Sequence, residues 1–322
     1  MRLNRIAASL LLACSTLTAY AQTALKLGHP QSATSAFQVG AVAFAEELNK
    51  LTKDKYKVDI FPSGALGGER EMTESVQLGT LDFVLTSTGP VGNFVPEVLV
   101  TDIPFLFRDY AHAHKVLDGE IGRELLAKFP AKGLVALAWG ENGFRHLTNS
   151  KRSVANPDDM KGLKLRTMEN QVHMAAFRAL GSLPTPMAFP EVFTALQQGT
   201  VDGQENPIPV ITSSKFGQVQ KHLTLTGHVY SPALFITSPA LFDKLPEAEK
   251  QAFRDAARAG AAAMRKRVAE VERSGIDELR TQGVAVVAEV NRAAFQAALK
   301  PAYEQYEKRF GAAAIERIRA VR

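Results

Sequence analysis

Hydrophobic and polar positions along the first third of the chain follow a regular order of strands and helices. Residues 24–28 and 56–61 alternate with a period of two and predict strands, whereas residues 35–51 carry apolar side chains at helical spacing. Residues 69–78 predict a second helix, and residues 81–86 a third strand. This strand–helix–strand–helix–strand order predicts an α/β fold with a parallel sheet covered by helices.

A second unit of the same kind is predicted between residues 145 and 226, with short strands near Leu163 and Val201 and helices between them. Residues 230–238 are apolar and rich in β-forming residues, so they predict a long strand that could pass between the two units. Residues 247–282 form a nearly uninterrupted helical pattern rich in alanine and arginine. We interpret this segment as an amphipathic packing helix rather than a partner or membrane surface.

The N-terminus has the features of a secretory signal peptide. Arg2 and Arg5 precede an apolar stretch, and Ala19-Tyr20-Ala21 forms a cleavage site of the A-x-A type. We therefore expect residues 1–21 to be removed and the protein to be exported to the periplasm. A lipoprotein signal ending at Cys14 is less favoured, because the apolar run before this cysteine is short.

Composition narrows the possible functions of the mature chain. Removal of 21 of the 322 residues leaves 301, enough for two domains, and takes away the single cysteine. Packing alone must then hold the core, since no disulfide can form. Loss of two arginines lowers the formal charge from +5 to +3. So mild a charge, scattered along the chain, argues against nucleic acid as a partner.

Two arginines and one amide are the strongest candidates for ligand contacts. Arg145 and Arg166 lie near the predicted ends of strands, where open α/β sheets place their ligands, and Asn206 follows. The planar fork of a guanidinium matches a carboxylate in a way that lysine cannot. The pattern therefore predicts an organic anion as ligand, although an arbitrary arginine is more often a solvated surface charge.

Two turns add further candidates. The glycine-rich segment 61–69 leads into a helix whose first turn holds Glu69 and Glu71, and carboxylates there more often cap the positive helix end than bind a ligand. The proline-rich segment 183–189 delivers Phe189 to a helix start. This aromatic ring could form the wall of a pocket or belong to the core.

Motifs of common enzymes are absent from the sequence. We find no phosphate-binding loop, no dinucleotide fingerprint, no nucleophile elbow and no metal-spaced cluster, so no cofactor or metal is expected. His112 and His114 could bind a metal opportunistically, but we expect them on a solvated helix face. A hydrolase or lyase is therefore disfavoured, and a surface adhesion or sensor-input protein would need a recognition partner that the sequence does not reveal.

Four stretches closely resemble the solute-binding proteins of tripartite ATP-independent periplasmic (TRAP) transporters of the DctP type. They are residues 67–70 with 77–83, 159–166, 184–193 and 195–207, and the similarity extends over essentially the whole mature chain. The resemblance implies a two-lobed clamshell with a long helix spanning both lobes, and integral-membrane TRAP subunits as partners. It implies lobe I as residues 22–143 plus 231–271 and lobe II as residues 144–230 plus 272–322. We expect a monomer.

The resemblance also assigns roles to the candidate residues. In this family the arginine at the end of Lys-Leu-Arg, here Arg166, typically holds the ligand carboxylate, and Arg145 and Asn206 complete the usual site. The other lobe contributes the helix start at Glu69 and the strand end at Thr86 and Ser87. Sialic acid is an unlikely ligand, because the branch of the family that binds it carries an acid where this chain has Ser87.

Carboxylates in the cleft would select among organic acids. Glu69 and Glu169, if both face the cleft, would accept hydrogen bonds from hydroxyls and repel a second carboxylate. We therefore expect a hydroxylated monocarboxylate such as a uronate or another sugar acid, with a C4-dicarboxylate or a small keto or hydroxy acid as alternatives. His173, which follows Arg166 on the next helix, and His29 are possible ligand contacts, but packing roles are more common for such histidines.

Overall fold

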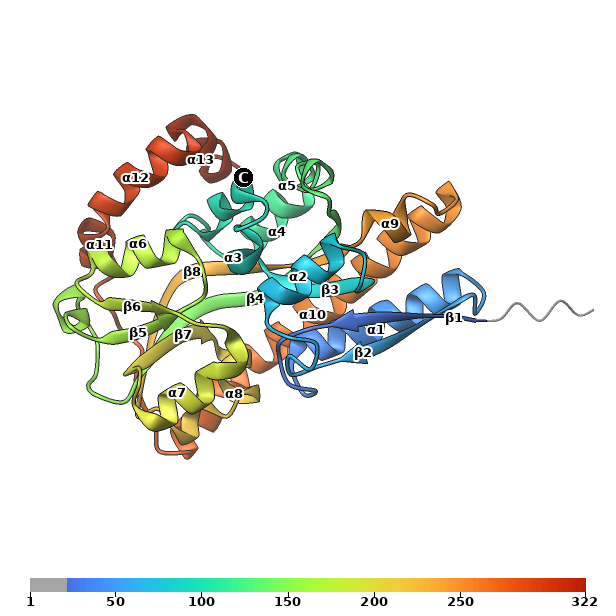
Figure 1. Cartoon of the computed structure of the whole chain (residues 1–322). Coiled ribbons are helices and arrows are strands. Elements are labelled where there is room, and N and C mark those ends of the chain that lie inside the picture. The colour runs from blue at the N-terminus through green and yellow to red at the C-terminus, as the bar shows by residue number, and fades with distance from the viewer. Residues whose placement is uncertain (1–21) are drawn as a thin grey trace, which may run out of the picture.

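The computed structural model describes residues 22–322, so the predicted signal peptide lies outside the described residues. The described chain forms a nine-stranded sheet flanked by helices (Figure 1). The strand order is β2-β1-β3-β8-β4-β7-β5-β6, and β9 pairs with β8. The strands are β1 Thr23–Gly28, β2 Tyr56–Phe61, β3 Phe83–Ser87, β4 Val135–Asn149, β5 Lys164–Thr167, β6 Leu183–Pro186, β7 Gly203–Pro207, β8 His222–Thr237 and β9 Ala285–Val287.

Helices connect almost all of these strands. The α-helices are α1 Ala36–Leu51, α2 Glu69–Gln77, α3 Thr88–Val91, α4 Tyr110–Asp118, α5 Glu120–Leu126, α6 Gln171–Ala179, α7 Val192–Gln198, α8 Ile208–Ser213, α9 Pro239–Phe242, α10 Glu247–Thr281, α11 Arg292–Ala298, α12 Lys300–Phe310 and α13 Ala312–Arg319. Short 3₁₀ turns are η1 Pro96–Asp102, η2 Pro130–Lys132, η3 Pro157–Met160, η4 Phe189–Glu191 and η5 Phe216–Gln218.

The predicted strand–helix order of the first unit is confirmed. Strand β1 pairs in parallel with both β2 and β3, and α1 and α2 form the connections. The pairing within this unit is parallel as predicted, whereas β8 runs antiparallel to β3 and joins the unit to the rest of the sheet. The sheet is therefore mixed.

Two long strands, β4 and β8, run between the two halves of the molecule, which form the expected two-lobed clamshell (Figure 1). They pair antiparallel, with Phe144 opposite Tyr230 near the middle. The predicted strand 230–238 covers only the second half of β8, and β4 was not predicted as a strand. Both strands are buried along most of their length, polar residues included, so the alternation that marks a half-buried strand is missing.

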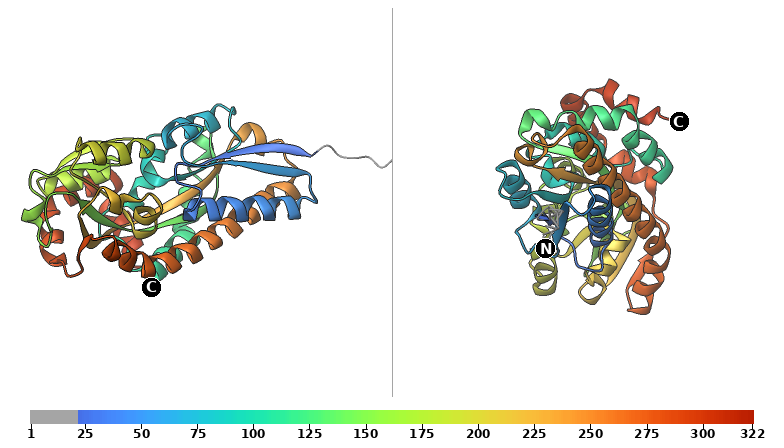
Figure 2. Two further views of the ribbon diagram at one scale, coloured as in Figure 1. Left: turned by 90° about the horizontal axis from the view of Figure 1, so that it is seen from below. Right: turned by 90° about the vertical axis from the view of Figure 1, so that its right-hand side faces the viewer.

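Helix α10 has almost the extent that the sequence predicts and runs the length of the molecule (Figure 2). Its buried face is rich in small residues and packs along α1. A Cβ on Gly260 would lie 2.7 Å from the carbonyl oxygen of Gly40, so glycine is needed where the two helices approach. The interpretation of this segment as a packing helix is confirmed, since α10 also packs on β4 and α8.

The C-terminal helices arch from one lobe to the other (Figure 1). In α11, Phe295 packs in the core of the second unit, whereas Ile315 and Ile318 of α13 pack in the core that contains α4. Arg317 donates hydrogen bonds to both carboxylate oxygens of Glu124 on α5, at 2.6 and 2.9 Å. The C-terminal segment thus contacts both lobes.

The histidine pair on α4 departs from expectation. His112 is buried, its Nδ1 accepts a hydrogen bond from the backbone of Arg108, and its Nε2 lies 3.0 Å from the carbonyl of Ile318. His114 contacts Glu141 at 2.5 Å. The prediction of a solvated helix face was therefore wrong, because α13 and β4 cover this side of α4.

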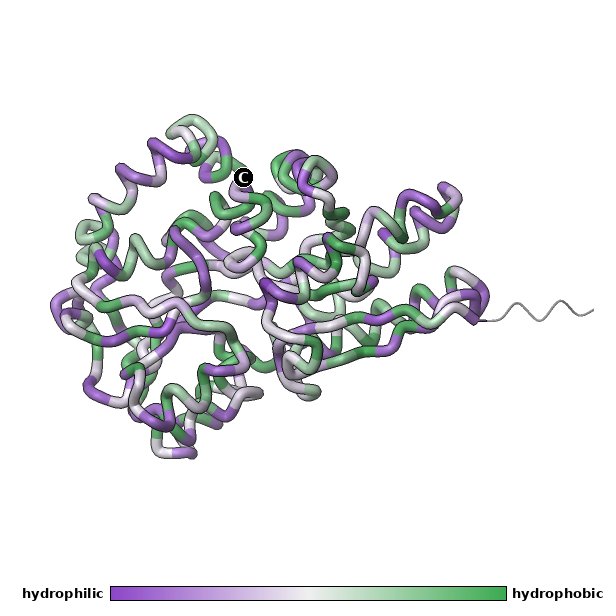
Figure 3. Tube along the Cα trace, in the orientation of Figure 1, coloured by the Kyte–Doolittle hydropathy of each residue, from purple (hydrophilic) through white to green (hydrophobic). Residues whose placement is uncertain are grey.

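Hydrophobic residues are interspersed with hydrophilic ones along every long helix (Figure 3). Among the described residues, no helix is both long and apolar enough to cross a membrane.

Candidate ligand-binding site

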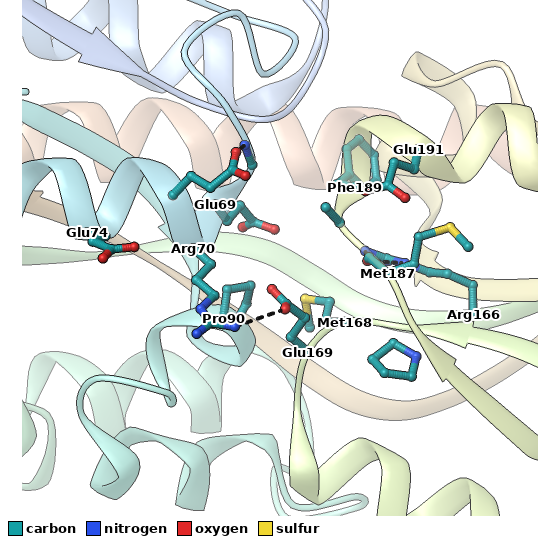
Figure 4. A pocket seen from close by; sticks show the side chains of 14 residues that line it. Glu69, Arg70, Glu74, Pro90, Arg166, Met168, Glu169, Met187, Phe189 and Glu191 are labelled. Carbon is teal, nitrogen blue, oxygen red and sulfur yellow. Dashed lines mark hydrogen bonds and ion pairs between the residues drawn. The ribbon is translucent and has the colours of Figure 1, made fainter.

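A cleft of about 450 Å³ lies between the two lobes (Figure 4). One wall comes from α2 and α3, and the other from the segments that follow β5 and β6. The lining residues are Gly68, Glu69, Arg70, Glu71, Glu74 and Pro90 on one side, and Arg166, Met168, Glu169, Pro186, Met187, Ala188, Phe189 and Glu191 on the other.

The start of α2 is built so that Glu69 remains available to the cleft. Gly67 has a φ of 108°, a conformation that favours glycine, and it turns the chain into the helix. The carboxylate of Glu71 accepts a hydrogen bond from the Gly68 backbone at 2.8 Å and so caps the helix. Of the two carboxylates considered for capping, Glu71 takes this role.

Glu69 is instead held by the end of β3. Its Oε1 accepts hydrogen bonds from the backbone N–H of Ser87 at 2.8 Å and from the Thr86 hydroxyl at 3.2 Å. The Ser87 hydroxyl in turn accepts one from Asn142 at 3.0 Å. The structure thus brings Glu69, Thr86 and Ser87 together as predicted, but only Glu69 lines the cleft.

Arg166 lies at the end of β5 and is 1 % exposed. Its Nε and Nη2 donate to the carbonyl of Met187 at 3.1 and 2.7 Å, whereas Nη1 has no hydrogen-bond partner among the described residues. Burial lowers the pKa of Arg166 to about 10, and the charge of Arg145 contributes to the lowering. Arg166 therefore stays cationic at neutral pH, and the Phe189 ring lies 5.8 Å from its guanidinium.

Arg145 lies within β4 rather than at a strand end, is fully buried, and does not line the cleft. Its Nε donates to Oε2 of Glu205 at 2.5 Å and its Nη2 to Oε1 at 2.8 Å, while Nη1 lies 3.3 Å from the Ser231 hydroxyl. Arg145 thus makes the bidentate contact that we expected with a ligand carboxylate, but it makes this contact with the carboxylate of Glu205.

Glu205 is the most important residue that the sequence analysis missed. It lies on β7 beside Asn206, is fully buried, and also contacts His228 at 3.1 Å. Burial alone would raise the pKa of Glu205, but Arg145 and His228 hold it well below its usual range. The sequence contained one indication of this role, because a buried arginine such as Arg145 needs a carboxylate partner.

The remaining predicted residues lie outside the cleft lining. Asn206 is buried and donates a hydrogen bond to Gln204 at 2.6 Å. His29 is buried with Nε2 2.9 Å from Gln38. His173 is buried with neither ring nitrogen paired within the described chain.

Glu169 lines the cleft and contacts the opposite lobe. Its carboxylate lies 3.7 Å from Arg70 on α2 (Figure 4). Asn93 donates to its backbone carbonyl at 3.2 Å. These contacts join the two walls at one edge of the cleft. Arg70 was not predicted, although it follows Glu69 directly.

The cleft as a whole is acidic. Five carboxylates, from Glu69, Glu71, Glu74, Glu169 and Glu191, face two guanidinium groups, from Arg70 and Arg166. Arg70 is already close to Glu169, so Arg166 remains as the cation for an anionic ligand group. Within residues 22–322 no cluster of three or more histidine, cysteine or acidic side chains could hold a metal ion.

Comparison with known proteins identifies the family. The model of bacterial extracellular solute-binding proteins of family 7, DctP, matches residues 27–309. The chain belongs to this family. Its members are periplasmic substrate-binding proteins of TRAP transporters and not enzymes.

Several curated relatives of this family 7 protein are similar over most of their length. A solute-binding protein of Verminephrobacter eiseniae is 58% identical, with 94% of this chain and 90% of the relative covered. The 2,3-diketo-L-gulonate-binding periplasmic protein YiaO of Escherichia coli is 41% identical, with 89% and 88% covered. The C4-dicarboxylate-binding periplasmic protein DctP of Rhodobacter capsulatus is 33% identical, with 92% and 90% covered.

Solved structures of TRAP solute-binding proteins share the fold. One from Polaromonas, bound to D-erythronate, superposes with a TM-score of 0.92 at 60% identity, covering 94% of this chain and 99% of that one. One from Bordetella bronchispeptica, with density assigned to pantoate, gives 0.92 at 53%, covering 94% and 100%. The sugar-acid-binding protein of Advenella mimigardefordensis, in complex with galactonate, gives 0.90 at 37%, covering 93% and 97%.

Proposed function

We propose that this family 7 protein binds a hydroxylated monocarboxylate, such as an aldonate or a uronate, and delivers it to the membrane subunits of a TRAP transporter. The observation that carries the proposal is the unpaired Nη1 of Arg166, which belongs to a buried cation at the cleft. A buried guanidinium nitrogen without an acceptor is costly, and a ligand carboxylate would remove this cost.

The acidic lining of the cleft favours a ligand that is uncharged apart from its single carboxylate. A second carboxylate would face five glutamates, and like charges at close range disfavour binding. Hydroxyl groups, in contrast, can donate to these carboxylates. The site therefore favours one anionic end and a neutral polyhydroxylated body.

The ligands of three similar structures agree with this chemistry, whereas two others hold succinate. D-erythronate, pantoate and galactonate, found with three similar structures, each carry one carboxylate and more than one hydroxyl. One relative is a C4-dicarboxylate-binding protein, so a C4-dicarboxylate remains the alternative ligand that we consider for this chain.

Within the cleft we assign direct ligand contacts to Arg166, Glu69, Glu169 and Phe189. Five other predicted site residues would act around them: Arg145, Asn206, Thr86, Ser87 and His29. Thr86 and Ser87 would hold the carboxylate of Glu69 in place, because both donate hydrogen bonds to it.

We further propose that ligand stabilises closure of the two lobes. Phe144 and Tyr230 are direct neighbours on the strands that run between the lobes, so they are suitable hinge positions. We keep lobe I as residues 22–143 plus 231–271 and lobe II as residues 144–230 plus 272–322, with the last two helices packing back onto lobe I. A ligand that bridges Arg166 and Glu69 gains both contacts only in the closed form, and this differential affinity would shift the population.

A thermal-shift panel tests the ligand class. The mature protein would be heated with erythronate, galactonate, gluconate, galacturonate, glucuronate, lactate, succinate and malate. A ligand at one hundred times its Kd stabilises the protein by about 2.7 kcal/mol, so sugar acids should give clear shifts. Larger shifts with succinate or malate than with every sugar acid would refute the proposed ligand class.

Two further measurements test the transport role. Small-angle scattering should show a smaller radius of gyration at saturating ligand, and the same data should show a monomer. Uptake of labelled ligand should require the exported protein together with integral-membrane TRAP subunits encoded by neighbouring genes. Uptake that is independent of the membrane subunits would contradict the proposed partnership.

A further inference from the structure

The segment from β5 into α6 concentrates buried polar atoms that have no hydrogen-bond partner. Seven such side-chain atoms occur among the described residues, and four of them belong to Arg166, Thr167 and His173: the Nη1, the hydroxyl and both ring nitrogens. Each of these three residues is at most 1 % exposed. Native proteins leave few such atoms unpaired, so a cluster within this short segment indicates a place for a polar guest.

His173 is a neutral side chain in this environment. Burial lowers its pKa to about 3, and the positive charge of Arg145 acts in the same direction, against the opposing effect of Glu205. Its Nδ1 lies 3.9 Å from the Glu205 carboxylate, which is too long for a direct hydrogen bond. A neutral imidazole offers one donor and one acceptor, and either nitrogen can take either role.

His173 and Arg166 lie on one short segment of the chain, and the charge of Arg166 adds to the effect of burial in lowering the pKa of His173. His173 is the third residue of α6, whose N-terminus is capped by Asn170, and Met168 and Glu169 of the intervening loop line the cleft. The Nε and Nη2 of Arg166 both donate to the Met187 carbonyl, so Nη1 is the guanidinium nitrogen left for a ligand.

We propose that Arg166 Nη1 and His173 form a subsite for the oxygen on carbon 2 of the bound acid. The inference rests on the proposed function, in which Arg166 holds the carboxylate. Carbon 2 is bonded to that carboxylate, so its oxygen lies beside the guanidinium. A 2-hydroxyl would donate to the unprotonated ring nitrogen, and a 2-oxo group would accept from the ring N–H of the other tautomer. A 2-deoxy acid would leave His173 unpaired.

The subsite makes His173 a residue that determines specificity. It predicts that the protein selects acids by the presence of an oxygen at carbon 2, and that hydroxy and oxo acids are both accepted. Removal of the imidazole should abolish this selection without abolishing the binding of the carboxylate by Arg166.

Matched ligand pairs test the assignment. Calorimetry would compare D-erythronate with 3,4-dihydroxybutanoate, and D-gluconate with 2-deoxy-D-gluconate, on wild type, His173→Leu and His173→Gln. Wild type should prefer the 2-hydroxy acid by at least about tenfold, since an unpaired buried polar group discriminates strongly. In His173→Leu the preference should fall below about threefold, and His173→Gln should retain part of it.

His112→Leu is the matched control, because His112 is a buried histidine on α4 whose ring nitrogens are both paired, one with the backbone of Arg108 and one with the carbonyl of Ile318. It should lose thermal stability but keep the full preference. If folded His173→Leu keeps the wild-type preference, the unpaired atoms hold only ordered water and the subsite is refuted. Should His173→Leu fail to fold, His173→Gln decides by the same criterion. If wild type binds none of the sugar acids, the proposed function fails first, and the subsite fails with it.

Discussion

Arg145 and Arg166 are two buried arginines in neighbouring parts of the same sheet, and they differ in what satisfies them. The Nε and Nη2 of Arg145 donate to the Glu205 carboxylate, and its Nη1 lies near the Ser231 hydroxyl, so the protein itself supplies the partners of Arg145. Arg166 donates to one backbone carbonyl, and its Nη1 has no partner in the part of the chain that the structure describes. Burial and residue type are the same in both cases, and the difference lies in the unfilled hydrogen-bonding capacity.

The two arginines also influence each other. The charge of Arg145 contributes to the lowered pKa of Arg166, while Glu205 opposes it. The ion pair of Arg145 with Glu205 therefore adds little net charge near the cleft, and Arg166 remains the cation that an anion would approach. In this comparison Arg145 is a scaffold residue, and Arg166 is the residue that binds.

The largest expected effect is the loss of affinity in Arg166→Ala. Removing one partner of a buried ion pair costs about 3–5 kcal/mol, or roughly 150- to 5000-fold in affinity. Calorimetry with the best ligand of the thermal-shift panel measures this loss. Circular dichroism should show an unchanged fold. Arg166→Lys should also bind poorly, because an ammonium lacks the planar set of donors that serves the Met187 carbonyl and a ligand carboxylate at once. A loss of less than tenfold in the alanine variant would remove Arg166 from the site.

Arg145→Met should reduce stability rather than recognition. The substitution leaves the buried Glu205 carboxylate with His228 as its remaining side-chain hydrogen-bond partner among the described residues, so the free energy of unfolding should fall by about 3–5 kcal/mol in urea denaturation at neutral pH. The double variant Arg145→Met/Glu205→Leu should recover most of this loss, because both charges are removed. A well-folded Arg145→Met protein without affinity for ligand would instead place Arg145 in contact with the ligand.

His173 should make stability depend on pH. In the folded state its pKa is lowered to about 3, whereas in the unfolded chain it is about 6.5. Between these values the unfolded state binds the extra proton, so stability is lost as the pH falls below about 6.5. Relative to His173→Gln, wild type should lose up to about 1.4 kcal/mol per pH unit between pH 6 and 4 in urea denaturation. Parallel pH profiles of the two proteins would contradict the buried neutral imidazole.

The smallest effect is expected for the pair at the cleft edge. Arg70 and Glu169 are 59% and 33% exposed in their side chains, and such pairs contribute about 0.2–1 kcal/mol. Arg70→Ala should therefore weaken binding less than about fivefold, and less still at high salt. Glu169→Gln sharpens the comparison: a much larger loss than in Arg70→Ala would mean that Glu169 touches the ligand directly.

The sequence predicted the elements whose pattern is amphipathic and local. Strands β1 and β2 and helices α1 and α10 have nearly the predicted bounds, because each presents one face to the core and one to solvent. Strand β4 was missed because it carries buried polar residues such as Glu141 and Asn142, whose partners come from distant elements. No local pattern records such partners.

The same limit applies to the site. Arg166, Glu69, Glu169 and Phe189 were predicted from motifs and line the cleft. The sequence could not reveal that Glu205 occupies the fork of Arg145, because the two residues are 60 positions apart and meet only across β4 and β7. The register of the strands determines which buried charges lie side by side, and this register is established only when the chain folds.

The shared strands have a consequence for the order in which the chain can fold. Strand β3 pairs with the far end of β8, where Phe83 lies opposite Thr237, and α1 packs on α10. The N-terminal unit is thus incomplete until residues beyond 237 have been synthesised. Before that point the chain has formed few long-range contacts, because closing long loops costs entropy that only the completed contacts offset. For a protein whose proposed destination lies across a membrane, this delay would keep the newly made polypeptide unfolded long enough to be threaded through a translocon.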